Sequence, residues 1–147
     1  MMNRTFAVLL TVALTACHGG ETNPLSPLGS SGAATVPGLR YETDRTAYSR
    51  SGEIVSQLVN ASEHDVGYNL CTSALERRTG GGWVVVRRSP ERPCILPLYI
   101  LRPGETATYR EPASAVPQPG TYRLRAQVEV PLNNGTRHIT TPPFTVQ

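Results

Sequence analysis

Lysine is absent from this 147-residue chain, and all 14 of its basic residues are arginines. Eleven acidic residues offset most of them, which leaves a formal net charge of +3. So small a surplus does not provide the broad basic face that nucleic-acid-binding domains present. We therefore expect no nucleic-acid partner.

Long apolar runs are also absent. The most apolar stretch, residues 6–14, is about half as long as the roughly 20 residues that a transmembrane helix needs. It follows Arg4 and precedes small residues, an arrangement typical of a secretory signal peptide. The sequence therefore predicts export rather than an integral membrane anchor.

The end of this stretch, Leu14-Thr15-Ala16-Cys17, resembles the lipobox of bacterial lipoproteins. The resemblance implies that a diacylglycerol is attached to Cys17, that cleavage occurs just before it, and that a membrane is a partner. In many diderm bacteria an aspartate after the cysteine marks retention in the inner membrane; His18 stands there, which favours the outer membrane. The alternative is an ordinary signal peptide whose cleavage site lies near a cysteine.

Three regions follow from this interpretation: a signal peptide at 1–16, the lipidated cysteine with a flexible tether at 17–37, and a folded domain at 38–147. The tether consists mostly of Gly, Ser, Pro, Thr and Ala. Such a composition buries too little apolar surface to offset the entropy of ordering the chain. The remaining length suits one domain.

Sustained helical periodicity is missing, and the 13 glycines and 13 prolines predict many turns. The clearest strand, at 121–130, alternates apolar and polar residues, which is typical of an antiparallel sheet with one face on a core. We predict an all-β fold, an antiparallel β-sandwich of about seven to nine strands. The other expected strands lie at 39–42, 53–60, 66–70, 75–78, 83–88, 106–110, 137–141 and 144–146.

A series of turn and core residues runs in the order Asn60-Ala61-Ser62, Cys71, Trp83, Cys94, a turn at 101–105 and Pro-Gly-Thr-Tyr-Arg at 119–123. Over residues 38–147 this order resembles bacterial immunoglobulin-like domains, and the intracellular proteinase inhibitor family is similar in outline. The resemblance implies an immunoglobulin-like sandwich. Tyr122 also resembles the tyrosine corner of such folds, in which the hydroxyl bonds to an upstream backbone carbonyl.

Lipidation of Cys17 leaves Cys71 and Cys94, and two cysteines in an exported domain are expected to form a disulfide. The bridge closes a loop of about 24 residues, worth roughly 3 kcal/mol in the chain-entropy model. If the strand at 66–70 continues, Cys71 falls on the face opposite Leu70. We therefore expect the disulfide to lie outside the core between the sheets.

Motifs that carry catalytic chemistry are absent. We find no nucleophile elbow and no paired-histidine helix motif, and neither a lysine nor a helix start follows the glycines at 80–82. His64-Asp65 is interpreted as a solvated turn rather than as half of a catalytic dyad. His18, His64 and His138 are scattered and form no ligand cluster with the cysteines. We expect no enzyme activity, no metal and no cofactor.

The most suggestive surface residues are four arginines on a predicted glycine-rich hairpin: Arg77, Arg78, Arg87 and Arg88. Paired across one tip, four guanidinium groups would bind carboxylate or phosphate groups of a glycan, a lipid headgroup or an envelope protein. The alternative is a solvated hairpin without a ligand. Trp83 beside them is expected to pack in the core rather than to hold a ligand.

The segment at 89–98 contains three prolines, which make it rigid. Its candidate contacts are Pro90, Arg92 and Pro93, because a preorganised loop loses little entropy on binding. We therefore predict a membrane-tethered immunoglobulin-like binding or structural module of the bacterial cell envelope. The alternative, raised by the similarity to the inhibitor family, is a protease inhibitor that presents this loop.

Overall fold

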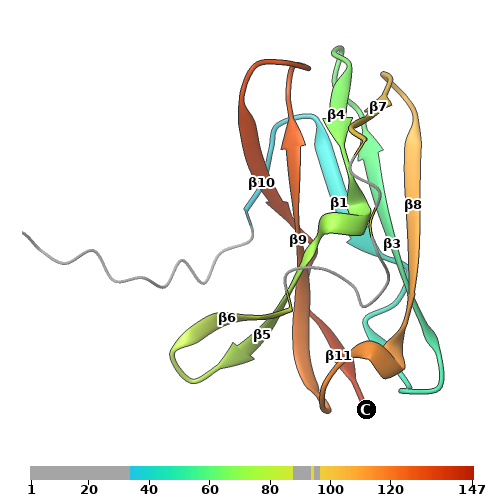
Figure 1. The fold of residues 1–147 in the computed structure, drawn as a ribbon, viewed down its shortest axis with the longest axis vertical. Coiled ribbons are helices and arrows are strands. Elements are labelled where there is room, and N and C mark those ends of the chain that lie inside the picture. The colour runs from blue at the N-terminus through green and yellow to red at the C-terminus, as the bar shows by residue number, and fades with distance from the viewer. Residues whose placement is uncertain (1–33, 88–93, 95–96) are drawn as a thin grey trace, which may run out of the picture.

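Two β-sheets pack face to face in the computed structural model, which describes residues 34–87, 94 and 97–147 (Figure 1). Sheet A has the order β1-β3-β8 and is antiparallel throughout. Its strands are β1 (Leu39–Thr43), β3 (Glu53–Asn60) and β8 (Thr106–Pro112).

Sheet B is built around the long strand β9 (Gly120–Glu129), and its main path has the order β2-β11-β9-β4-β7. The strand β10 also pairs with β9, and β5 pairs with both β9 and β6. Among the strands of the described residues, only β11 and β2 pair in parallel. The other strands are β2 (Ala47–Tyr48), β4 (Val66–Tyr68), β5 (Ala74–Thr79), β6 (Gly82–Arg87), β7 (Tyr99–Leu101), β10 (Thr136–Thr140) and β11 (Phe144–Val146).

Helical structure in the described residues is limited to two 3-10 turns, η1 (Leu70–Thr72) and η2 (Ala113–Ala115). In the described part of the chain, no helix has the length and apolar character needed to cross a membrane.

The core lies between the sheets and follows the alternation that the sequence predicts. In β9, Tyr122, Leu124, Ala126 and Val128 are each at most 3% exposed. Leu58 of sheet A is fully buried in the same core cluster. The predicted all-β sandwich is therefore confirmed.

The strand count differs from the seven to nine that the sequence predicts: eleven strands occur in the described ranges. The sequence analysis missed β2 and β7, which have two and three residues. Strands this short show too little alternation to be recognised from sequence. The predicted strand at 66–70 also ends early, at Tyr68, where η1 takes over.

The predicted tether extends slightly too far. Val36 is 3% exposed and belongs to the core, and the backbone N–H of Thr140 donates to the carbonyl of Ala34 (3.0 Å). The ordered domain thus includes residues 34–37. The rest of the predicted tether and the signal peptide lie outside the described residues.

Two side chains that carry the immunoglobulin-like resemblance hold the ends of strands in place. The Tyr122 hydroxyl donates to the backbone carbonyl of Gln118, which is the tyrosine-corner bond that the resemblance implies. Asn60, fully buried at the end of β3, donates from Nδ2 to the carbonyls of His64 (2.8 Å) and Leu101 (2.9 Å). Asn60 thereby joins sheet A to β7 of sheet B.

Candidate functional site

The hairpin of β5 and β6 projects from the body of the sandwich (Figure 1). Only the residues from Ala74 to Arg77 pair with β9, so the rest of the hairpin extends past the sheet. At the tip, a Cβ added at Gly80 or Gly81 would meet nothing within 4 Å. The tip is therefore surrounded by solvent.

A buried carboxylate fixes the hairpin to β9. Glu76 is 3% exposed, and its two oxygens contact Nε of Arg123 (2.7 Å) and Nε of Arg125 (3.0 Å). The Arg123 guanidinium also lies 4.4 Å from the ring centre of Trp83, close enough for a cation–π contact. Charge-assisted bonds of this kind hold the hairpin in one orientation on the sheet.

Trp83 does not join the core as the sequence analysis expects. It pairs with Arg78 and thus lies on the hairpin face that carries Glu76, opposite the face of the buried Leu75. There it is half-buried against Arg123. The period-two alternation of β6 explains this placement, because Trp83 and Val85 share the outer face.

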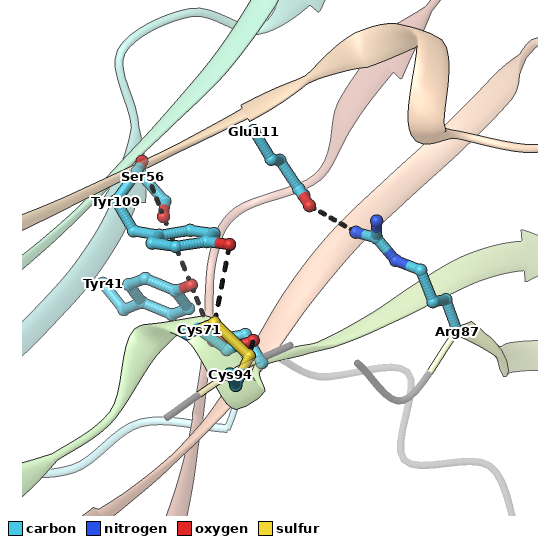
Figure 2. Close-up of polar contacts among 8 residues, drawn as sticks. Tyr41, Ser56, Cys71, Arg87, Cys94, Tyr109 and Glu111 are labelled. Carbon is cyan, nitrogen blue, oxygen red and sulfur yellow. Dashed lines mark hydrogen bonds and ion pairs between the residues drawn. A yellow bond between two sulfur atoms is a disulfide. The ribbon is translucent and has the colours of Figure 1, made fainter. Parts of the chain in front are cut away.

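Arg87 lies at the base of the hairpin, so its predicted place at the tip is wrong. The register pairs it with Leu75, and its guanidinium donates to Glu111 of β8 (Figure 2). The side chains of Arg87 and Glu111 are 13% and 6% exposed. Within the described residues, Arg87 Nε and Nη1 and Glu111 Oε1 have no hydrogen-bond partner. Arg87 therefore joins the hairpin to sheet A instead of presenting a charge to a ligand.

The remaining described arginines of the hairpin are Arg77 and Arg78. Arg78 is exposed, whereas Arg77 is half-buried and its Nη2 lies 3.5 Å from the carbonyl of Pro119. Two large apolar side chains, Val84 and Val86, are 50% and 38% exposed on β6. The distal hairpin thus presents positive charge together with uncovered apolar surface.

The other predicted site residues lie outside the described residues. These are the lipidation site Cys17, the fourth arginine Arg88, and the loop contacts Pro90, Arg92 and Pro93.

The predicted disulfide between Cys71 and Cys94 is formed, with a Cα–Cα distance of 5.8 Å. It lies at the rim of the core, where Cys71 is half-buried and the Tyr109 hydroxyl is 3.7 Å from its sulfur (Figure 2). The predicted reason is wrong, because the strand does not continue to Cys71. Asn69 Oδ1 accepts from the backbone N–H of Cys71 (3.1 Å) and begins η1 there.

Beside the disulfide, an open groove of about 360 Å³ runs between β7 and β8, the end strands of the two sheets. Three tyrosines dominate it; the ring centres of Tyr68 and Tyr99 are 5.8 Å apart, and burial raises the pKa of Tyr68. Its volume is that of a small-ligand pocket, and the described residues that line it are all uncharged. Its lining residues are Tyr68, Asn69, Leu70, Cys71, Tyr99, Thr108 and Tyr109.

Sequence reasoning missed this groove because it did not predict β7. The only signal was the short aromatic and β-branched run Tyr99-Ile100-Leu101, which favours a strand. Among the described residues, no group of three or more His, Cys, Asp or Glu side chains is placed so that it could hold a metal ion.

Comparison with known proteins gives likenesses of fold only. No protein-family model matches the chain, and no curated protein sequence matches it. Among solved structures, the chain is similar to a PapD-like domain of human CEP192 (TM-score 0.38, 13% identity, 98% of this chain and 96% of that one). It is also similar to part of the alkylpurine DNA glycosylase AlkC of Pseudomonas fluorescens (TM-score 0.39, 11% identity, 79% of this chain).

A third similar structure is a β-glucosidase of Erythrobacter marinus (TM-score 0.35, 13% identity, 75% of this chain). The chain spans about a third of AlkC (32%) and 15% of this glucosidase. At these TM-scores and identities, the likenesses carry no argument about function.

Proposed function

We propose that the protein is a non-catalytic binding or structural module of the bacterial cell envelope, tethered to a membrane by lipid on Cys17. The observation that carries the proposal is the Cys71–Cys94 disulfide, because disulfides form and persist outside the reducing cytoplasm. The lipobox-like residues 14–17 supply a route to that compartment.

The geometry of the domain supports a binding or structural role. Its interior is filled by side chains, and the accessible features of the described residues include a projecting hairpin and a tyrosine-lined groove. Tyrosines give large, rigid contact surfaces at little cost in conformational entropy, as in the recognition loops of antibodies.

The anchor is tested by expressing the full chain in a bacterial host and determining the mass of its N-terminal peptide. We expect a mature chain that begins at a diacylated Cys17 and that enters the detergent phase in phase separation. The Cys17→Ser variant should remain in the aqueous phase or keep its signal peptide. An unlipidated mature start, or a full-length product in the cytosol, would contradict the proposal.

The outer membrane is the proposed location in a diderm host, because His18 rather than aspartate follows Cys17. Density-gradient separation should find the protein with outer-membrane markers. The matched variant His18→Asp should move it to the inner-membrane fraction. Recovery of both proteins in the inner membrane would exclude this location.

A further inference from the structure

The β5–β6 hairpin combines positive charge with uncovered apolar side chains. Residues 74–87 contain three arginines and one acid, a net charge of +2, and that acid, Glu76, is buried in ion pairs. Arg77, the last residue of β5 that pairs with β9, and Arg78 just past it are therefore balanced by no exposed carboxylate of the hairpin. Val84, which pairs with Arg77 and shares its face, is 50% exposed, and Val86 on the same strand is 38% exposed. Arg78 pairs with Trp83 on the opposite face, so a surface that meets the hairpin tip-first contacts both faces.

This surface is held rigidly. The Glu76 carboxylate fixes the hairpin to β9 of sheet B, and Arg87 fixes its base to Glu111 of sheet A. The tip residues Gly80 and Gly81 carry no side chain that would keep the flanking residues away from a flat surface. A preorganised surface loses little entropy when it binds.

We propose that this hairpin is a second membrane-contact site, which docks on an anionic lipid surface. Such a surface attracts basic residues electrostatically, and its headgroup boundary takes up apolar side chains. A soluble anion would account for the two arginines, but it would leave the exposed valines unexplained. A lipid surface accounts for both.

The proposal rests on the proposed function for the presence of a membrane nearby. A lipid anchor is more stable when a basic patch supports it, so the hairpin and Cys17 would act together. In Figure 1 the chain enters the fold beside β10, on the same side of the view as the hairpin. The hairpin and a lipid anchor located before Ala34 in the sequence can thus face the same membrane surface.

Trp83, the only tryptophan of the chain, reports directly on the hairpin. The test uses residues 17–147 with Cys17→Ser, which keep the fold because every core residue lies between Val36 and Val146. Vesicles of phosphatidylethanolamine and phosphatidylglycerol should shift Trp83 emission to shorter wavelength, and brominated lipids should quench it. Vesicles of phosphatidylcholine should do neither, and free glycerol phosphate should cause no shift.

Two pairs of substitutions separate the hairpin from net charge. Since each arginine at an anionic surface strengthens binding roughly fivefold, Arg77→Gln with Arg78→Gln should weaken vesicle binding about 30-fold. The matched control, Arg102→Gln with Arg137→Gln, removes the same charge from two exposed positions, one after β7 and one in β10 beside the end of β9 that does not pair with β5, and should weaken binding much less. Val84→Ser with Val86→Ser should reduce quenching by brominated lipids.

Three results would overturn the proposal: no spectral change with anionic vesicles, equal losses in the two arginine pairs, or an equal shift with glycerol phosphate. The test protein has Cys17→Ser and so carries no lipid. If it fails to bind vesicles, the hairpin proposal is wrong, but the lipidation of Cys17 is still tested independently by the mass of the N-terminal peptide of the full chain. Conversely, an unlipidated Cys17 would not alter the vesicle result.

Discussion

Arg87 and Glu111, which are 24 residues apart in the sequence, form an ion pair between the two sheets. Both side chains are nearly buried, and only one hydrogen bond between them is made, while Arg87 Nε and Nη1 and Glu111 Oε1 lack partners in the described residues. The removal of two charges from water is expensive, and one bond repays little of that cost. The pair therefore specifies where the hairpin sits more than it stabilises the fold.

Single and double substitutions distinguish these two roles. Arg87→Met or Glu111→Leu alone should lower the free energy of unfolding by about 3–5 kcal/mol, because each leaves an unpaired buried charge. The double variant should regain most of that loss, since both charges are then gone. Urea denaturation at neutral pH measures all three.

The exposed pair of Arg110 and Glu53 provides a matched control on the same strand as Glu111. Its side chains are 60% and 59% exposed, with a separation of 3.5 Å. Arg110→Met should therefore cost less than about 1 kcal/mol. If the losses at Arg87 and Glu111 are additive in the double variant, the two charges do not depend on each other and this account is wrong.

The sequence predicts the sandwich well because alternation is a local property. The apolar face of β9 can be recognised from the alternation within its own ten residues, and β3 has its predicted bounds. The place of Arg87 is different, because it depends on a β-bulge between Leu75 and Glu76 that brings Arg87 opposite Leu75. A bulge changes the register by one residue and leaves no clear mark in the sequence.

The tyrosine groove also escapes sequence reasoning, for a topological reason. Tyr68, Tyr99 and Tyr109 come from three strands, and their meeting depends on how the two sheets pack. Tyr99 belongs to a strand of three residues, too short for a pattern. By contrast, the pairing of Cys71 with Cys94 follows from parity alone once Cys17 is set aside.

The disulfide should contribute strongly to stability. It joins residues separated by 23 positions, so its loss should cost roughly 3 kcal/mol, within the usual 2–5 kcal/mol for small exported domains. The double variant Cys71→Ser with Cys94→Ser, compared with the wild type in thermal denaturation, measures the loss. Tyr109→Phe, which removes only the hydroxyl next to Cys71, is the control and should change little. An unchanged melting temperature in the double variant would show that the thiols are not bridged in the folded protein.

Tyr41 should make stability fall in alkaline solution. It is 3% exposed, its hydroxyl lies 3.1 Å from Ser73 Oγ, and burial raises its pKa from 10.0 to about 12. Between these two values the unfolded chain loses the tyrosine proton while the folded chain keeps it, so stability decreases as pH rises. From about pH 10 to pH 12 the decrease approaches 1.4 kcal/mol per pH unit.

The absence of lysine makes this decrease measurable, because no ammonium side chain titrates in the same window and arginines stay charged. We expect the free energy of unfolding of Tyr41→Phe to fall less steeply between about pH 9 and pH 11 than that of the wild type. Tyr48, whose pKa burial raises to about 12, and Tyr68, whose pKa burial also raises, remain in both proteins and contribute the residual slope. Identical slopes for the wild type and Tyr41→Phe would mean that the Tyr41 hydroxyl ionises as freely in the folded chain as in the unfolded one.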